Sequence, residues 1–430
     1  MIEILSPGAR RRRLFSIGIV LTGVVSVATP VRAQEAPAPA PTPTARPIDA
    51  PIAGGQPIPR SAATPQDIKD AAAGFFSGRW DYNISAGEAW QLNPDVVPGD
   101  TSQSAFVDSV DAGLSFRRRS ARSQFSLAGG GQVEQFRYQE GDVPNRNWLS
   151  GNGSIMFTQQ LSPRTSMNLA EAIESTDASN SSLLVESGLL YRRVRTLTSR
   201  ASGGLTQLIG SHSSVLLNVR HEYVNFNDPL LLDGSQLAPS ATITRQGGPG
   251  KMLGASYLFQ FSQSGPNHTA AHTLFGSWSG TAGQRWTAAA ALGGSRVAST
   301  GIWEPYAVFE VTSRLPRGDF YLRGSHNVSQ AYGLGTQMIA TIVTAGLRHR
   351  FARRFETSFS LAYDRSRALS ANAVPFQTTS AQGSARVGMT KHVYLSVSGY
   401  YTLRKSEAPG IADTTTAGAG LSVAYLGLPR

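Results

Sequence analysis

The chain has 430 residues, a formal net charge of +11 at pH 7 and no cysteine. The absence of cysteine excludes zinc–thiolate sites, disulfide scaffolds and thiol catalysis. Several of the positive charges are arginines near the N-terminus, and the basic residues elsewhere form no lysine-rich or helical stripe, which argues against a nucleic-acid partner.

The N-terminus has the three parts of a secretory signal. Arg10 to Arg13 form a basic region, residues 14–28 form a short apolar stretch, and Val31 and Ala33 supply the small residues of a cleavage site. We therefore predict a signal peptide over residues 1–33, cleaved before Gln34, and export from the cytoplasm.

Proline and alanine dominate the next segment, residues 34–63, which favours an extended, disordered periplasmic stretch. Thr64, Pro65 and Asp67 then provide a helix cap, a proline at the first helical position and an acid in the first turn. They predict one short helix over residues 64–77. This helix is expected either at the periplasmic mouth of the following domain or inside it.

From residue 78 onwards the hydrophobic pattern has a period of two. Val215, Leu217 and Val219, for example, are separated by residues that include Asn218 and Arg220. No apolar run of 18 residues follows the signal, which excludes a transmembrane helix, and the mean hydropathy is only −0.17. Strands that alternate between lipid and a polar lumen average out in this way.

The connections between these strands alternate in length. Short turns are predicted near residues 118–121, 161–165, 281–284, 315–318, 352–354 and 390–392, and longer loops near residues 93–104, 139–147, 175–181, 263–269, 366–375 and 406–414. Outer-membrane barrels have short periplasmic turns and long extracellular loops. The pattern predicts an all-β, antiparallel, up-and-down transmembrane barrel over residues 78–430.

The strand count is 18 or 19, and closure with both ends in the periplasm requires an even number. We predict 18 strands, with 16 or 20 as alternatives. The ambiguity lies between residues 225 and 250, where the count of 18 treats Ala241 to Gln246 as no membrane strand.

The repeated unit of strand, Pro/Arg turn and strand, seen at Phe157 to Leu169 and at Phe351 to Leu361, resembles the outer-membrane β-barrel proteins of Gram-negative bacteria. Such proteins are porin-like, and some accompany exopolysaccharide export. The resemblance covers residues 79 to 428 and implies a location in the outer membrane. One departure is the C-terminus, where five residues follow Tyr425 although such barrels usually end on an aromatic residue.

If the apolar phase of each strand faces lipid, charged residues of the other phase line the lumen. The predicted pore-lining residues are Arg117, Arg192, Arg220, Arg323, Arg348, Arg386, Arg404, Asp111, Glu186, Glu222, Glu356 and Asp364. They predict a mixed-charge, slightly basic pore in which a surplus of arginine favours anions. The alternative is that these charges pair with one another and fill the lumen structurally.

The six tryptophans and tyrosines such as Tyr138, Tyr191, Tyr223 and Tyr401 fall mostly towards strand ends, as interfacial girdles do. The spacing of His268 and His272 is that of a helical metal pair, but Pro266 and Asn267 place them in a loop or strand. We predict no catalytic residues, no metal and no cofactor.

Two functions remain open. The first is a channel, either a passive pore or an export conduit for polar solutes; the second is a non-conducting structural or interaction barrel. Expected partners are outer-membrane lipid, the barrel assembly machinery, and small polar solutes or a polysaccharide. No nucleic acid is expected.

Overall fold

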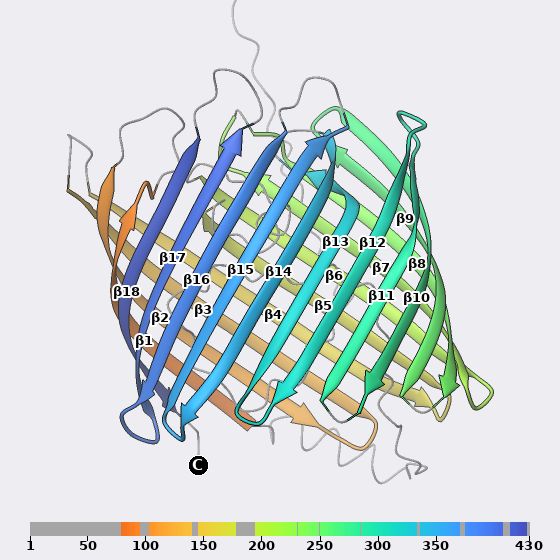
Figure 1. The fold of residues 1–430 in the computed structure, drawn as a ribbon, viewed down its shortest axis with the longest axis horizontal. Helices are drawn as coiled ribbons and strands as arrows, with labels where there is room; N and C mark the ends of the chain where they lie inside the picture. The colour runs from red at the N-terminus through yellow and green to blue at the C-terminus, as the bar shows by residue number, and fades with distance from the viewer. Residues whose placement is uncertain are drawn as a thin grey trace, which may run out of the picture.

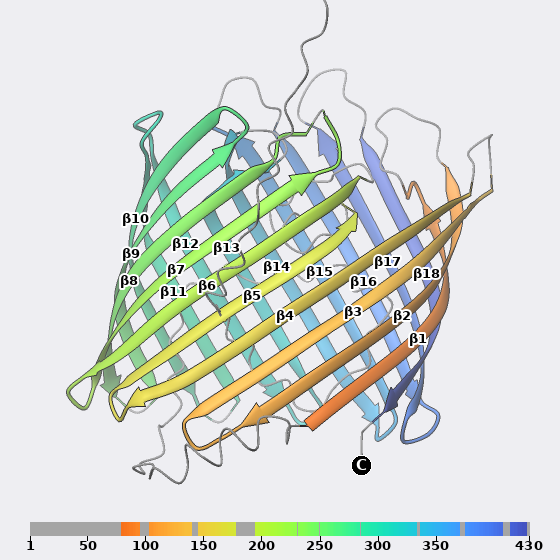
Figure 2. The ribbon, with the colours of Figure 1, turned by 180° about the vertical axis from the view of Figure 1, so that it is seen from behind.

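The computed structural model describes residues 79–94, 103–139, 145–177, 194–229, 231–248, 250–283, 285–332, 336–369, 375–406 and 413–427. Every regular element in these residues is a β-strand (Figures 1 and 2). Among them, no helix is long and apolar enough to cross a membrane. The predicted signal peptide, the Pro/Ala-rich segment and the predicted helix over 64–77 lie outside the described residues.

Eighteen strands of 12 to 17 residues follow one another along the chain. They are β1 (Arg79–Leu92), β2 (Ser104–Arg119), β3 (Ser123–Tyr138), β4 (Arg146–Ser162), β5 (Thr165–Asp177), β6 (Arg195–Ile209), β7 (Ser213–Phe226), β8 (Gly234–Gly248), β9 (Lys251–Ser264), β10 (Asn267–Ala282), β11 (Trp286–Val297), β12 (Trp303–Leu315), β13 (Gly318–Ala331), β14 (Thr336–Ala352), β15 (Phe355–Ala368), β16 (Phe376–Gly388), β17 (Val393–Ser406) and β18 (Thr414–Gly427).

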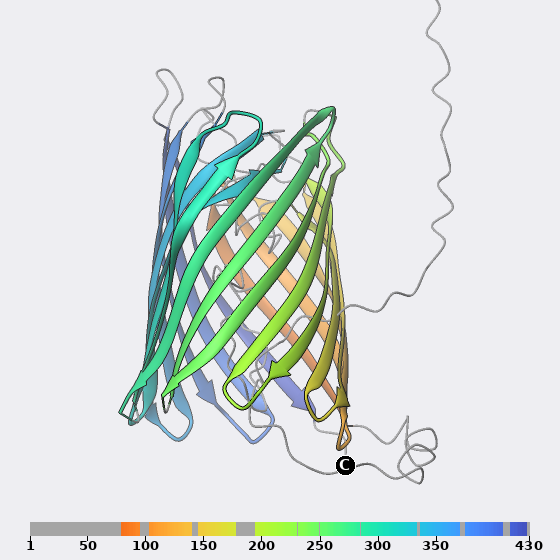
Figure 3. The same cartoon turned by 90° about the vertical axis from the view of Figure 1, so that its right-hand side faces the viewer.

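The sheet closes on itself into a barrel. Each strand pairs antiparallel with its neighbours in the chain, and β1 also pairs with β18, where Tyr82 lies opposite Gly427. Closure leaves no sheet edge unpaired, as lipid requires of any strand that crosses it. The predicted fold class and the count of 18 strands are confirmed. The barrel is narrower in Figure 3 than in Figure 1, which is a view from 90° away, so its cross-section is oval.

Two details of the sequence prediction are wrong. Ala241 to Gln246 belong to a full strand, β8, although Pro239 interrupts its pattern, and β8 pairs with both β7 and β9. The long loop predicted over residues 263–269 is a tight turn instead, because β9 continues to Ser264 and β10 begins at Asn267. Gly265 adopts a positive φ of 56° there, a conformation that suits glycine and permits the tight turn.

The outer surface carries the apolar phase of the strands. Exposed side chains on it include Ile84, Val110, Leu149, Leu217 and Leu274, each more than 50% accessible. Large apolar side chains exposed around a closed barrel are stable only against lipid. The fold therefore places hydrocarbon on the outside and the polar phase of the strands in the lumen.

Candidate pore and its constriction

Strand register fixes which side chains face the lumen. Successive side chains of a strand point to opposite faces, and directly opposed residues of neighbouring strands share a face. On β7, Leu217 and Val219 are exposed on the outer surface, so Asn218, Arg220 and Glu222 lie on the lumen phase. The registers extend this assignment around the barrel.

Ten of the residues predicted to line the pore lie on the lumen phase: Arg117, Arg220, Arg323, Arg348, Arg386, Arg404, Asp111, Glu222, Glu356 and Asp364. Arg192 and Glu186 lie outside the described residues. The placement gives these side chains access to the lumen, and their role in lining a conducting pore remains a prediction.

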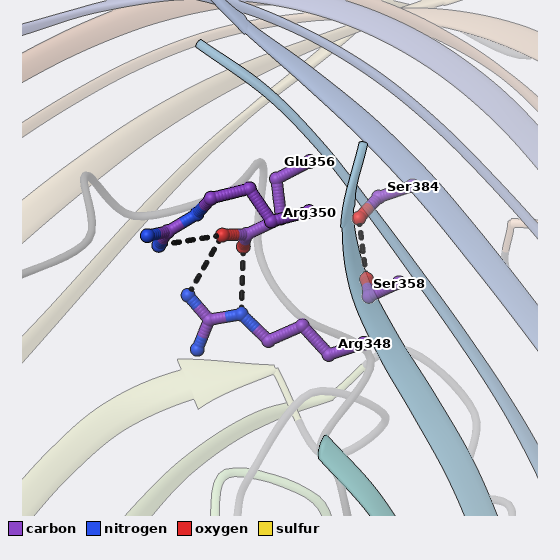
Figure 4. A network of polar contacts seen from close by, with 5 residues as sticks. All are labelled: Arg348, Arg350, Glu356, Ser358 and Ser384. Atoms are coloured by element: carbon purple, nitrogen blue, oxygen red, sulfur yellow. Dashed lines mark hydrogen bonds and ion pairs between the residues drawn. The ribbon is translucent and has the colours of Figure 1, made fainter. Parts of the chain in front are cut away.

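One cluster of these charges surrounds Glu356 on β15 (Figure 4). Arg348 binds both carboxylate oxygens, with Nε–Oε1 at 2.7 Å and Nη2–Oε2 at 3.1 Å, and Arg350 reaches Oε2 at 3.3 Å. Arg386 lies directly opposite Glu356 on β16. Three arginines around a single carboxylate give this part of the lumen wall a positive charge.

A second cluster surrounds Glu222, whose side chain is only 7% exposed. Its Oε1 lies 3.3 Å from Nε of Arg200 on β6 and 3.1 Å from Nε of Arg220, while Tyr332 donates a hydrogen bond to Oε2 at 3.3 Å. A carboxylate buried this deeply is stable only when paired and hydrogen-bonded. Glu222 therefore depends on all of these partners.

Tyr332 reaches Glu222 from the opposite wall. It follows directly on β13, which is not a neighbour of β7 in the sheet, and it is only 3% exposed. Together with Met338 of β14 it packs in an apolar cluster with Val224 of β7 and Phe376 of β16. The loop end of β13 and β14, at Tyr332 and Met338, thus lies inward across the lumen, and we call this contact the constriction.

The barrel wall is adapted to the inward hairpin in two places. A Cβ at Gly234, the first residue of β8, would lie 2.6 Å from the Tyr332 ring, so only glycine leaves room for the ring. Arg367 of β15 also donates a 3.0 Å hydrogen bond to Glu304 of β12, joining the two strands that flank β13 and β14. Both features support the inward position of the hairpin.

Aromatic residues lie at both ends of the lipid-facing phase. Trp80 and Trp286 are exposed towards the short-turn end, and Trp90 and Trp303 towards the loop end. Such girdles mark the two interfaces of a bilayer. Two predicted girdle residues are exceptions: Trp148 and Tyr138 lie on the lumen phase and pack against a buried cluster that contains Phe136. Tyr191 lies outside the described residues.

The lipid-facing phase also carries charges that the sequence pattern did not single out. Near the loop end, Arg137 binds Glu88 at 2.7 Å and Asp108 at 2.9 Å across three neighbouring strands. Glu171 lies between apolar Leu169 and Ile173 on β5, opposite Ile155 and Ala201. In the described part of the chain its carboxylate has no ion pair or hydrogen bond.

The histidines do not assemble a metal site in the described residues. His268 and His272 lie four residues apart on β10, a distance of about 13 Å in a strand. His326 shares a 2.7 Å hydrogen bond with the Thr341 hydroxyl, and Ser329 lies on the opposite phase of β13. No group of three His, Asp or Glu side chains within the described ranges can hold a metal ion.

Sequence reasoning missed several members of the two clusters. Arg200 and Arg350 share the alternation of their strands, so a complete count of lumen-phase charges would have included them. Glu310 lies outside these clusters, but it is a further lumen-phase charge that the prediction left out, and it binds Arg323 at 3.0 Å. Tyr332 gave no signal, because a residue beyond a strand end has no phase until the hairpin is placed.

The protein is an outer-membrane β-barrel. Its barrel is closed, has an even number of strands and carries an apolar outer band, aromatic girdles and short turns at one end. No protein-family model matches the chain, and no curated protein matches its sequence.

Solved structures with a similar fold include outer-membrane porins and the siderophore receptor PirA from Pseudomonas aeruginosa. Pseudomonas aeruginosa OccK7 (OpdD) is 8% identical, with a TM-score of 0.47, and the match covers 81% of this chain and 99% of that one. OccK2 (OpdF) from the same organism, in complex with glucuronate, is 11% identical, with a TM-score of 0.44, and the match covers 82% of this chain and 98% of that one. A BenF-like porin from Pseudomonas fluorescens Pf-5 is 9% identical, with a TM-score of 0.43, and the match covers 81% of this chain and 99% of that one. The role in exopolysaccharide export, which the family resemblance implied, stays a prediction.

Proposed function

We propose that this protein is a passive channel for small polar solutes in the outer membrane. The observation that carries the proposal is the separation of the two strand phases: apolar side chains cover the outside, and charged side chains of both signs lie on the lumen phase. A lumen of this kind holds water, and opposed charges across it favour polar solutes over apolar ones.

Purified protein in planar lipid bilayers tests the proposal. We expect discrete conductance steps in potassium chloride, because a water-filled barrel carries ions. Folding must be established in the same sample by heat-modifiable migration on a gel. A folded protein that produces no steps, with the constriction intact or opened as described below, contradicts the channel function.

A second candidate is a non-conducting barrel, and the constriction is the observation that favours it. Tyr332 crosses the lumen to Glu222, and the hairpin buries an apolar cluster that includes Val224 and Met338. If the hairpin seals the lumen, wild-type protein is silent and variants that displace Tyr332 conduct. Deleting residues 34–76 tests the separate possibility that the N-terminal segment closes the barrel.

A further inference from the structure

Arginine recurs at one position in the short turns of the barrel. These eight turns join β2 to β3, β4 to β5, and so on to β16 and β17. The last residue before the following strand is arginine in five of them: Arg122, Arg164, Arg285, Arg317 and Arg354. The remaining three turns end on His212, Gly250 and His392. We call the five arginines the turn-end ring.

Backbone hydrogen bonds fix the position of each ring member. The Arg285 carbonyl accepts a 2.8 Å hydrogen bond from the Arg314 amide, and the Arg317 carbonyl accepts one of 2.6 Å from the Arg350 amide. The carbonyls of Arg122, Arg164 and Arg354 accept equivalent bonds from Gln160, Leu208 and Gly388. Each ring residue thus extends the register of the sheet by one pair.

This register assigns the ring to the lumen phase. Arg350 is the partner of Glu356 in the lumen cluster, so Arg317, directly opposite Arg350, belongs to the same face. Gly388 follows the same rule, and a Cβ there would lie 3.5 Å from Cβ of Arg354. The five arginines therefore surround the short-turn mouth of the lumen, which faces the periplasm in outer-membrane barrels.

Few acids neutralise this mouth. In the described part of the chain, Arg164, Arg285 and Arg354 are exposed and form no ion pair. The lumen-phase acids at this end of the described strands are Asp81, Asp319 and Glu356. Asp81 pairs with Arg79, Glu356 is bound by Arg348 and Arg350, and Asp319 lies opposite both Arg314 and Arg348. The charge that remains at the mouth is positive.

We propose that the turn-end ring is the charge-selective element of the channel and makes it prefer small anions, such as carboxylates and inorganic phosphate, over cations. The inference rests on the proposed channel function. Rings of arginine are suited to anion pores, and the guanidinium group matches the geometry of carboxylate and phosphate oxygens. Convergence of fixed cations on the mouth raises the local concentration of anions before they enter.

Two double variants with equal loss of charge test the proposal. Arg285→Gln with Arg317→Gln removes two ring members. The matched control is Arg118→Gln with Arg245→Gln, because these arginines lie at the same end but opposite lipid-facing Phe125 and Leu253. The reversal potential in a potassium chloride gradient from 10 to 100 mM gives the anion-to-cation permeability ratio, and heat-modifiable migration establishes that each variant folds.

We expect wild-type protein and the control to favour chloride equally. The ring variant should lose about 15-fold in this preference, because two unit charges about 10 Å from the ion in water favour an anion about fourfold and disfavour a cation by the same factor. The loss should shrink in 1 M salt. A wild-type channel without anion preference, or equal losses in both variants, overturns the role of the ring and leaves the channel function standing. Absence of conductance in all folded proteins, constriction variants included, overturns the channel function itself.

Discussion

Tyr332→Ala is expected to release the constriction while leaving the barrel wall intact. The side chain is 3% exposed and packs with Val224 and Met338, and truncation of a buried aromatic ring costs about 3–5 kcal/mol. Loss of its hydrogen bond leaves one oxygen of Glu222 unsatisfied, which costs about 1–3 kcal/mol more. A change of about 3 kcal/mol alters the ratio of inward to displaced hairpin more than a hundredfold.

Gly234→Ala should produce the same effect by a different route. A Cβ at position 234 would lie 2.6 Å from the Tyr332 ring, so the ring must move, at a cost of about 1–3 kcal/mol. Gly418→Ala is the matched control: its Cβ would crowd the Tyr400 ring at 2.5 Å, but Tyr400 and Gly418 are direct neighbours on the wall and take no part in the hairpin contact.

Single-channel recording in planar bilayers is the assay for both variants. Tyr332→Ala and Gly234→Ala should show larger conductance steps than wild type, or steps where wild type shows none, while Gly418→Ala should match wild type. If both variants fold and their conductance equals that of wild type, the constriction at Tyr332 does not limit the path and the reasoning is refuted.

Three carboxylates give further predictions. Glu222→Gln should destabilise the barrel by about 3–5 kcal/mol, because two partly buried arginines lose their charged partner; a urea midpoint equal to wild type would count against this. Glu356→Gln should increase chloride preference, since Arg348 and Arg350 keep their charge; an unchanged or lower reversal potential would disagree. Glu171→Leu should stabilise folding into bilayers by up to about 2 kcal/mol, because it removes a charge from the lipid face; a loss of stability would reveal a partner for Glu171.

The sequence was informative about the barrel wherever the chemistry is local to a strand. Alternation along β7 separates Leu217 and Val219 from Arg220 and Glu222, because the side-chain period of a strand is two in any fold. Ten predicted pore-lining residues fell on the lumen phase for this reason. Prediction was wrong at Ala241 to Gln246, where Pro239 obscured a strand, and at residues 263–269, where the length of a polar segment was taken for the length of a loop.

The amino-acid sequence alone indicated the antiparallel barrel, its two phases and the arginines of its short turns, since each follows from local periodicity and turn chemistry; the even strand number came from the requirement of closure. Only the tertiary structure decided which charges meet. Arg200 and Arg220 converge on Glu222 because β6 and β7 pair in one register, and Tyr332 joins them because the β13–β14 hairpin folds inward from another wall. The contact between Tyr332 and Glu222 depends on the closure of the barrel, which brings together residues about a hundred positions apart.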